Sequence, residues 1–294
     1  MPEPKLLVEG LSFPESPRWH DGRLWFADWG TQEVIAVDLA GTKEVVLRIP
    51  APPDRQAGGA ARGPFSIDWL PDGRLLVVAG RDRRLLRQEA DGSLADHAEL
   101  DDRGWNEIAV DDRGNIYLNA VGFDFVAGEA FAPGTVVLLT PDGSLRQVAE
   151  GIAFPNGMAV TPDDATLIVA DSYGRKLVAF DIIEDGTLSD QRTWADLGDG
   201  APDGICLDED GAVWYADVPN RRCVRVREGG AVLQTIDVDR GCFSCALGGP
   251  DGRTLFIAAT EWRGPAAAAT LLDTGRILAV EAPAAGADWR PGPG

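Results

Sequence analysis

The chain has 294 residues, of which 45% are hydrophobic and 25% are charged, and this composition excludes a disordered, collagen-like or coiled-coil protein. Its formal net charge of −20 weighs against partners that are bound by neutralising phosphate groups. We therefore expect neither nucleic acid nor an anionic membrane surface as a partner.

The N-terminal segment, residues 1–9, has neither the basic region nor the apolar run of a secretory signal. No stretch of the sequence is apolar for long enough to span a membrane as a helix. The four cysteines are too few for a disulfide framework. These features predict a cytoplasmic protein, and we expect a monomer or a homodimer.

Further along the chain, a strand-like hydrophobic run preceded by an Asp/Gly turn recurs six times. The runs span residues 21–28, 72–79, 113–119, 163–171, 210–217 and 251–258. Their turns start roughly 40 to 50 residues apart, which is the period expected for four-stranded propeller blades. A short apolar segment before the turn, such as 108–110 or 205–207, completes a hairpin in which glycine supplies the positive φ that the turn needs.

Period-2 hydrophobic runs dominate the chain, and no long segment has the 3.6-residue period of a helix. Radial repetition protects the sheet edges of such an all-β chain. We therefore predict an all-β fold, a six-bladed β-propeller of four-stranded antiparallel blades formed by residues 1–283 as a single domain. The N-terminal strand 6–9 is expected to join the last blade beside 276–280 and close the ring, and 284–294 to form a loose tail.

Three segments depart from the repeat, namely 50–64, 122–134 and 261–274. The segment 122–134 carries three phenylalanines, among them Phe123, and is too apolar for an ordinary exposed loop. It fits either a flap that covers a pocket or a packed surface loop, and the sequence leaves both interpretations open.

One position of the repeat, just before the first strand of each blade, concentrates polar residues. It is occupied by Glu15, Phe65-Ser66, Asn106, Asn156, Asp203 and Ser244. Equivalent positions of successive blades surround one axis, so the oxygen-bearing members, Glu15, Asn106, Asn156 and Asp203, are predicted to share a central site. The alternative is that the Asn-Gly and Asp-Gly pairs among them are ordinary turn residues.

Two carboxylates and two amides form a hard, oxygen-only ligand set, which suits one divalent cation. Ca²⁺ is the expected ion, with Mg²⁺ or Mn²⁺ as alternatives. Zn²⁺ is the weakest alternative, because the chain has only two histidines. These are His20 and His97, and both are expected at the surface.

Other chemistries lack their motifs. The sequence has no Gly-x-Ser-x-Gly elbow and no Gly-rich phosphate loop. Cys242 and Cys245 form a single Cys-x-x-Cys without a second pair, so we expect buried structural thiols rather than a metal or redox centre.

The most specific motifs are Pro-Glu-Ser-Pro at 14–17, Phe-Pro-Asn-Gly-Met-Ala at 154–159, Pro-Asp-Gly-Ile-Cys-Leu-Asp at 202–208 and Leu-Gly-Gly-Pro-Asp at 247–251. At these residues the sequence resembles the senescence marker protein/gluconolactonase (regucalcin-like) family of six-bladed propeller lactonases, and less closely the diisopropyl fluorophosphatase branch. The resemblance covers nearly the whole chain. It implies a divalent metal held by Glu15, Asn156 and Asp203. It further implies Asn106 as a fourth ligand or substrate contact, and Asp203 as the general base.

One motif departs from that family's pattern. The sugar-lactone members carry Arg-x-Asn-Asp around the second Asn, whereas residues 103–107 of this chain read Arg-Gly-Trp-Asn-Glu. The displaced arginine and the added tryptophan predict a ligand that is flatter or more apolar than an aldonolactone. The candidates for the substrate pocket are Trp105, Arg103, Trp19 and Phe123.

These features predict metal-dependent hydrolysis of a lactone or a related ester. In this hypothesis the ion polarises the carbonyl group, Asp203 deprotonates the attacking water and Asn106 assists turnover. Two alternatives stay open. One is hydrolysis of an organophosphate or phosphotriester at the same ion, and the other is a non-catalytic propeller that binds a ligand and uses the ion only as a brace.

Overall fold

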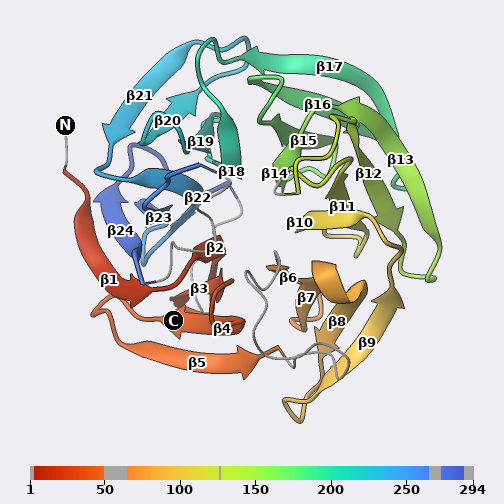
Figure 1. Cartoon of the computed structure of the whole chain (residues 1–294), viewed down its shortest axis with the longest axis horizontal. Helices are drawn as coiled ribbons and strands as arrows, with labels where there is room; N and C mark the ends of the chain where they lie inside the picture. The colour runs from red at the N-terminus through yellow and green to blue at the C-terminus, as the bar shows by residue number, and fades with distance from the viewer. Residues whose placement is uncertain (1–2, 50–64, 126, 265–272, 288–294) are drawn as a thin grey trace. The chain divides into compact units, whose positions relative to one another are not determined.

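The computed structural model describes residues 3–49, 65–125, 127–264 and 273–287. Their strands form six four-stranded antiparallel sheets (Figure 1). The fold class is a six-bladed β-propeller, which confirms the prediction from the repeat. The departing segment 50–64 lies outside the described residues.

The chain divides into two compact units. The first unit comprises Met1–Gly63, Asp203–Arg227 and Val232–Gly294, and the second comprises Pro64–Pro202 and Glu228–Ala231. Each unit holds three of the sheets, and Pro202, the first residue of one strand in the first unit, is counted with the second.

The strands of the first unit are ordered β2-β3-β4-β5, β18-β19-β20-β21 and β1-β24-β23-β22. Their bounds are β1 (Lys5–Leu11), β2 (Pro14–His20), β3 (Arg23–Asp28), β4 (Glu33–Val37), β5 (Lys43–Arg48), β18 (Pro202–Leu207), β19 (Val213–Asp217), β20 (Arg222–Val226), β21 (Val232–Asp237), β22 (Gly241–Gly248), β23 (Thr254–Thr260) and β24 (Gly275–Glu281). The N-terminal strand completes the last sheet as predicted, because β1 pairs with β24 in a register that places Leu6 opposite Leu278.

The strands of the second unit are ordered β6-β7-β8-β9, β10-β11-β12-β13 and β14-β15-β16-β17. Their bounds are β6 (Phe65–Trp69), β7 (Leu75–Ala79), β8 (Arg84–Gln88), β9 (Leu94–Glu99), β10 (Gly104–Val110), β11 (Ile116–Val121), β12 (Gly134–Leu139), β13 (Leu145–Ile152), β14 (Pro155–Val160), β15 (Thr166–Asp171), β16 (Lys176–Ile182) and β17 (Leu188–Asp196). A three-residue 3₁₀ turn, η1 (Gly80–Asp82), follows β7. No helix in the described part of the chain is long and apolar enough to cross a membrane.

The Asp/Gly turns between the first two strands of a sheet are held by their own side chains. Asp208 Oδ1 accepts hydrogen bonds from the backbone N–H groups of Asp210 and Ala212, both at 3.0 Å. Gly211 adopts a φ of +73° within this turn, a conformation that glycine reaches without a steric penalty. The recurring Asp/Gly pair therefore fixes where each first strand ends and each second strand begins.

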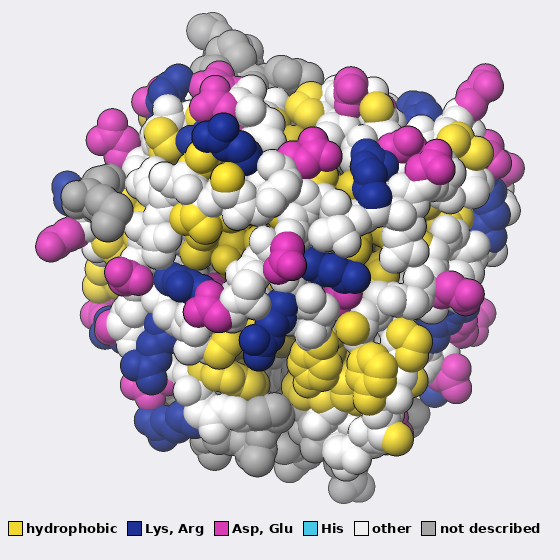
Figure 2. All heavy atoms as spheres, turned by 90° about the horizontal axis from the view of Figure 1, so that it is seen from above, with side chains coloured by type: hydrophobic (Ala, Val, Ile, Leu, Met, Phe, Trp, Pro, Cys, Tyr) yellow, Lys and Arg dark blue, Asp and Glu magenta, His cyan; other side chains and the backbone are white. Residues whose placement is uncertain are grey.

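Burial falls from the middle strands toward the last strand of a sheet. All five residues of β7, and likewise of β19, are buried, whereas β5 is mostly exposed and β21 is half exposed. A strand that is buried on both faces reads as a continuous apolar run, which is why the second strands were visible in the sequence. Acidic and basic side chains are interspersed over the face drawn in Figure 2, as expected for charges that solvate a surface.

The first residues of the predicted loose tail, 284–287, are hydrogen-bonded to the first unit. Ala285 O accepts a hydrogen bond from the backbone N–H of Glu209 at 2.8 Å, and the N–H of Gly286 donates to Gly252 O at 3.0 Å. The structure thus extends the ordered chain past residue 283, because these backbone groups find partners in two hairpin turns. The rest of the tail lies outside the described residues.

Candidate active site

The predicted polar position coincides with a β-bulge in four of the first strands, one of them being β22, where the register shifts between Cys242 and Ser244. The register with the following strand shifts between Glu15 and Arg18 in β2, between Trp105 and Ile108 in β10, and between Pro155 and Met158 in β14. A bulge places an extra residue on one strand, bends it and changes the direction of a side chain. Glu15, Asn106 and Asn156 lie at or inside these bulges.

Asn106 and Asn156 contact each other within the second unit. The Nδ2 of Asn106 donates to Asn156 Oδ1 at 3.3 Å and to Pro155 O at 3.4 Å. Asn106 is 9% exposed, and Asn156 is partly buried. The structure therefore brings together two of the four predicted ligands, from the first strands of two different sheets.

Asn119, in β11, holds both bulges and was not among the predicted site residues. It is fully buried. Its Nδ2 donates to Asn156 O at 2.6 Å, while its Oδ1 accepts from the backbone N–H of Glu107 at 3.2 Å. The available signal was the residue type, because an Asn stands here in a strand whose other positions are apolar or small.

Glu107 adds a buried carboxylate beside Asn106. Its side chain is 4% exposed in the folded chain, and its Oε2 accepts a hydrogen bond from the backbone N–H of Ile108 at 3.3 Å. In the sequence, Glu107 belongs to the motif 103–107, but no role is predicted for it. In its ionised form this carboxylate would add negative potential beside the amide pair, where a cation would be favoured.

The segment that presents Asn156 is anchored by the end of β15. Asp171 Oδ1 accepts the backbone N–H of Phe154 at 3.0 Å, and the N–H of Ser172 donates to Phe154 O at 3.0 Å. The side chain of Ser172 then lies beside the amide, because Asn156 Nδ2 donates to Ser172 Oγ at 3.4 Å. The Ser172 hydroxyl in turn donates to Pro202 O at 2.6 Å.

In the first unit, Glu15 is presented by the same device. Asp28 accepts the backbone N–H of Phe13 at 2.9 Å, and the N–H of Trp29 donates to Phe13 O at 2.9 Å. Glu15 is 3% exposed, and its Oε2 accepts the N–H of Ser16 at 2.8 Å. The repeated Phe-Pro motif therefore marks a corner that an aspartate fixes from the neighbouring strand.

Asp203, the other predicted carboxylate, is partly buried near the start of β18. The residue after it, Gly204, permits close packing of β18 against β22, since an added Cβ would lie 2.0 Å from Ser244 Oγ. Ser244, which occupies the repeat position in its own blade, therefore contacts the residue that follows Asp203. A side chain at Gly204 would displace the strand that carries Asp203.

The chemistry of the donor set fits a hard divalent cation. The set predicted from the sequence contains two carboxylates, Glu15 and Asp203, and two amides, Asn106 and Asn156, which are ligand types that Ca²⁺ prefers. Among the residues that the structure describes, no group of three or more His, Cys, Asp and Glu side chains is placed to hold a metal. The predicted ligand set lies outside that definition, because two of its four members are asparagines.

The cysteines do not form a disulfide framework. All four are free thiols, and Cys223, Cys242 and Cys245 are buried. The Sγ atoms of Cys206 and Cys245 lie 3.8 Å apart.

The four predicted pocket residues have different surroundings. Trp105 is 1% exposed and packs in a hydrophobic core cluster. Arg103 stacks over the Trp105 ring and pairs with Asp101 at 2.8 Å. Trp19 stacks on Phe256, with ring centroids 5.5 Å apart. Phe123 alone joins a group of exposed rings, in the segment 122–134.

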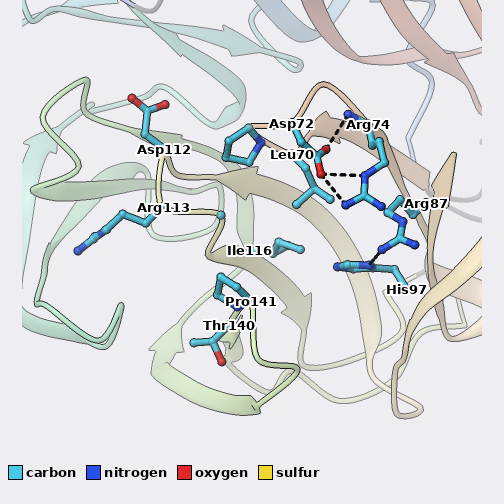
Figure 3. Close-up of a pocket in the computed structure, with 12 residues that line it drawn as sticks. Leu70, Asp72, Arg74, Arg87, His97, Asp112, Arg113, Ile116, Thr140 and Pro141 are labelled. Carbon is cyan, nitrogen blue, oxygen red and sulfur yellow. Dashed lines mark hydrogen bonds and ion pairs between the residues drawn. The ribbon is translucent and has the colours of Figure 1, made fainter. Parts of the chain in front are cut away.

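A cavity of about 340 Å³ lies at the other end of the β10–β11 hairpin, near Leu70, Gly114 and Ile116 (Figure 3). Its basic side chains are paired. Arg74 binds Asp72 at 2.5 Å, Arg87 binds Glu89 at 2.6 Å and Arg113 binds Asp111 at 3.2 Å. His97 also lines the cavity, where burial and then the Arg87 guanidinium lower its pKa.

Comparison with known proteins places the chain in a family. The profile described as "SMP-30/Gluconolactonase/LRE-like region" matches residues 13–261. Regucalcin of Xenopus laevis is 27% identical over 265 residues, covering 86% of this chain and 84% of its own. Diisopropyl-fluorophosphatase of Loligo vulgaris is 27% identical over 202 residues, covering 63% of each chain. Pentonolactonase XacC of Haloferax volcanii is 27% identical over 192 residues, again covering 63% of each.

A solved structure has the same fold over almost the whole length. A luciferin-regenerating enzyme superposes with a TM-score of 0.77 at 19% identity, covering 97% of this chain and 98% of that chain. At this identity the likeness concerns the fold alone. The family profile, by contrast, spans most of the sequence, and the chain belongs to the SMP-30/gluconolactonase/LRE-like family.

Proposed function

We propose that this protein hydrolyses a lactone in a reaction that depends on a divalent cation, with Glu15, Asn106, Asn156 and Asp203 as the ligands of the cation. The observation that carries the proposal is the contact between Asn106 and Asn156 at the predicted repeat position. Membership of a family whose description includes gluconolactonase, and a relative named as a pentonolactonase, support the reaction type. Ca²⁺ is the ion that we propose first.

A bound cation would polarise the lactone carbonyl and make an attacking water more acidic. The chain's own residues supply the rest. Asp203 accepts the proton of the water through a carboxylate oxygen. The buried amide of Asn106 has both donor and acceptor atoms, so it can orient the carbonyl group of the substrate as well as contact the ion. Asn119 keeps the two amides in place.

The test compares Asp203→Asn with Asp237→Asn, an exposed carboxylate on the last strand of the same sheet. Proton release is measured on a panel of sugar, aliphatic and aromatic lactones, before and after chelation and with Ca²⁺ restored. We expect Asp203→Asn to lower kcat by about 10²- to 10⁴-fold and Asp237→Asn to behave as wild type. Full activity after extensive chelation would contradict the proposal.

A second candidate function is hydrolysis of a phosphotriester at the same residues, favoured by the similarity to diisopropyl-fluorophosphatase. The two reactions share an electrophile attacked by water, and they differ in the shape of the transition state. Rates on diisopropyl fluorophosphate and on the lactone panel separate them. A non-catalytic role would instead show as loss of thermal stability on chelation with no turnover of any substrate.

A further inference from the structure

Five rings of the second unit form one cluster, called here the aromatic shelf. Its members are Phe123, Phe125, Phe131, Phe154 and Tyr173. The centroid of the Phe123 ring lies 5.5 Å from that of Phe131 and 5.9 Å from that of Tyr173. The Phe154 centroid lies 4.8 Å from Tyr173 and 5.4 Å from Phe125. These spacings are those of favourable aromatic pairs, so the segment 122–134 packs against the start of β14 and the end of β15.

The shelf is buried at its base and open above. Phe154 is 8% exposed, whereas Phe125 is 36%, Tyr173 55% and Phe131 59% exposed. The buried ring of Phe154 accounts for the packing of this cluster. That packing does not explain why the other three rings face solvent. A contiguous exposed group of aromatic side chains is typical of a ligand surface.

The shelf adjoins the amide pair through shared residues. Phe154 stands two positions before Asn156 on the same anchored corner. Ser172, which accepts a hydrogen bond from Asn156 Nδ2, is followed at once by Tyr173. The segment that precedes Asn156 and the segment that contacts its amide therefore both carry rings of the aromatic shelf.

We propose that the aromatic shelf binds an apolar substituent of the lactone, so that the preferred substrates are alkyl- or aryl-substituted lactones rather than polyhydroxylated sugar lactones. This inference rests on the proposed function. The physical reason is that a sugar lactone needs hydrogen-bonding partners for its hydroxyl groups, whereas the five rings offer one phenolic hydroxyl among apolar faces. Burial of the substituent against the rings removes apolar surface from water.

The first arm of the test is a series of γ-lactones that differ only in alkyl length, from γ-butyrolactone to γ-nonalactone, together with dihydrocoumarin and glucono-δ-lactone. In the wild-type protein we expect kcat/KM to rise about two- to fourfold for each added methylene group. Phe131→Ala and Tyr173→Ala should each lower the ratio of kcat/KM for γ-nonalactone to that for γ-butyrolactone by about tenfold. Phe131→Leu should restore part of the ratio.

Leu145→Ala is the matched control, because Leu145 is an apolar residue of the same unit with 40% exposure and lies on the outer strand β13. This variant should keep the wild-type ratio. Melting temperatures close to that of the wild type would show that the ring variants are folded. Ratios that Phe131→Ala and Tyr173→Ala leave unchanged, or a preference for glucono-δ-lactone, would overturn the inference.

The second arm separates this inference from the proposed function. Binding of the same lactones is measured by saturation-transfer NMR, which needs no turnover. If no lactone is hydrolysed but affinity still rises with alkyl length and falls in Phe131→Ala, the proposed function fails and the apolar binding surface stands. If hydrolysis occurs while affinity does not depend on alkyl length, the proposed function stands and the aromatic shelf has no role in selection.

Discussion

The two ends of the β10–β11 hairpin in the second unit present opposite kinds of polar surface. At one end, Asn106 and Asn119 are buried and uncharged, and their amides are bonded to neighbouring bulges. At the other end, the cavity in Figure 3 carries Arg74, Arg87 and Arg113, each paired with a carboxylate. The cavity carries three arginines, yet the proposed chemistry belongs to the first end.

The difference teaches how to weigh polar groups in this fold. Partly exposed ion pairs contribute little to stability and are screened by salt. A buried amide, by contrast, costs free energy unless each of its donors and acceptors is satisfied. The buried asparagines beside the bulges of β10 and β14 therefore point to a function, whereas the paired arginines of the cavity do not.

The largest effect is expected from removing one member of the amide pair. Asn156→Ala deletes a proposed ligand of the cation and the acceptor of the Asn106 hydrogen bond. We expect kcat/KM on the best lactone to fall at least about 100-fold, with weaker binding of Ca²⁺ by calorimetry. A variant with wild-type turnover and wild-type Ca²⁺ affinity would remove the contrast between the two ends.

A smaller effect should follow from Asn119→Ala, for which Asn115, the residue just before β11, is the matched control. Both side chains are buried, and Asn115 Nδ2 donates to Asp111 Oδ2 at 2.8 Å. Each substitution should destabilise the fold by about 1–3 kcal/mol in denaturant unfolding. Only Asn119→Ala should also weaken Ca²⁺ binding, by about 10- to 100-fold.

Equal effects of the two alanine substitutions on Ca²⁺ binding would mean that Asn119 acts only through general stability. A loss of Ca²⁺ affinity in Asn119→Ala alone would show that the two ends of one hairpin differ in their role, since both residues are buried asparagines of that hairpin.

Next in size is the charged cavity itself. Arg74→Ala removes an ion pair whose partners are both partly exposed, so we expect a loss of less than about 1 kcal/mol in the free energy of unfolding. Turnover of the lactone panel should stay at the wild-type level. A tenfold loss of kcat/KM in this variant would show that the cavity takes part in the reaction.

The smallest effect concerns pH. Burial and the Arg87 guanidinium lower the pKa of His97 below its ordinary value of 6.5, so the unfolded chain takes up a proton before the folded chain does. Stability is therefore lost as the pH falls through the range below about 6.5. His97→Gln should reduce the drop in melting temperature between pH 7 and pH 5, and an unchanged drop would contradict this assignment.

The sequence predicts the sheets well because their signals are local. Aspartates in the hairpin turns accept backbone hydrogen bonds from residues two or four positions further on, as Asp208 and Asp251 show. The joining of strand 6–9 to the blade of 276–280 followed from the need to close the ring, and β1 pairs with β24 in the structure. These features depend on neighbours within a few residues or on the arithmetic of the repeat.

The site is predicted less completely, because its supports come from distant segments. The role of Asn119 depends on bulges in β10 and β14, and no residue beside it in the sequence shows them. Ser172 and Tyr173 likewise gain their roles only when the end of β15 packs on Phe154. Trp105 is predicted to line a pocket from its place beside Asn106, and the structure shows its ring packed in a hydrophobic cluster, a contact that the sequence did not reveal.

The pairing of β1 with β24 has a consequence for synthesis. Lys5 pairs with Ala279, so β1 has no partner strand until β24 has been synthesised. Until then the nascent chain carries an unpaired edge whose Val8 and Leu11 side chains are buried only in the finished sheet. The last sheet therefore forms only after β24 has been synthesised. Chains that end before β24 should expose this unpaired strand edge and be recognised there by chaperones or proteases.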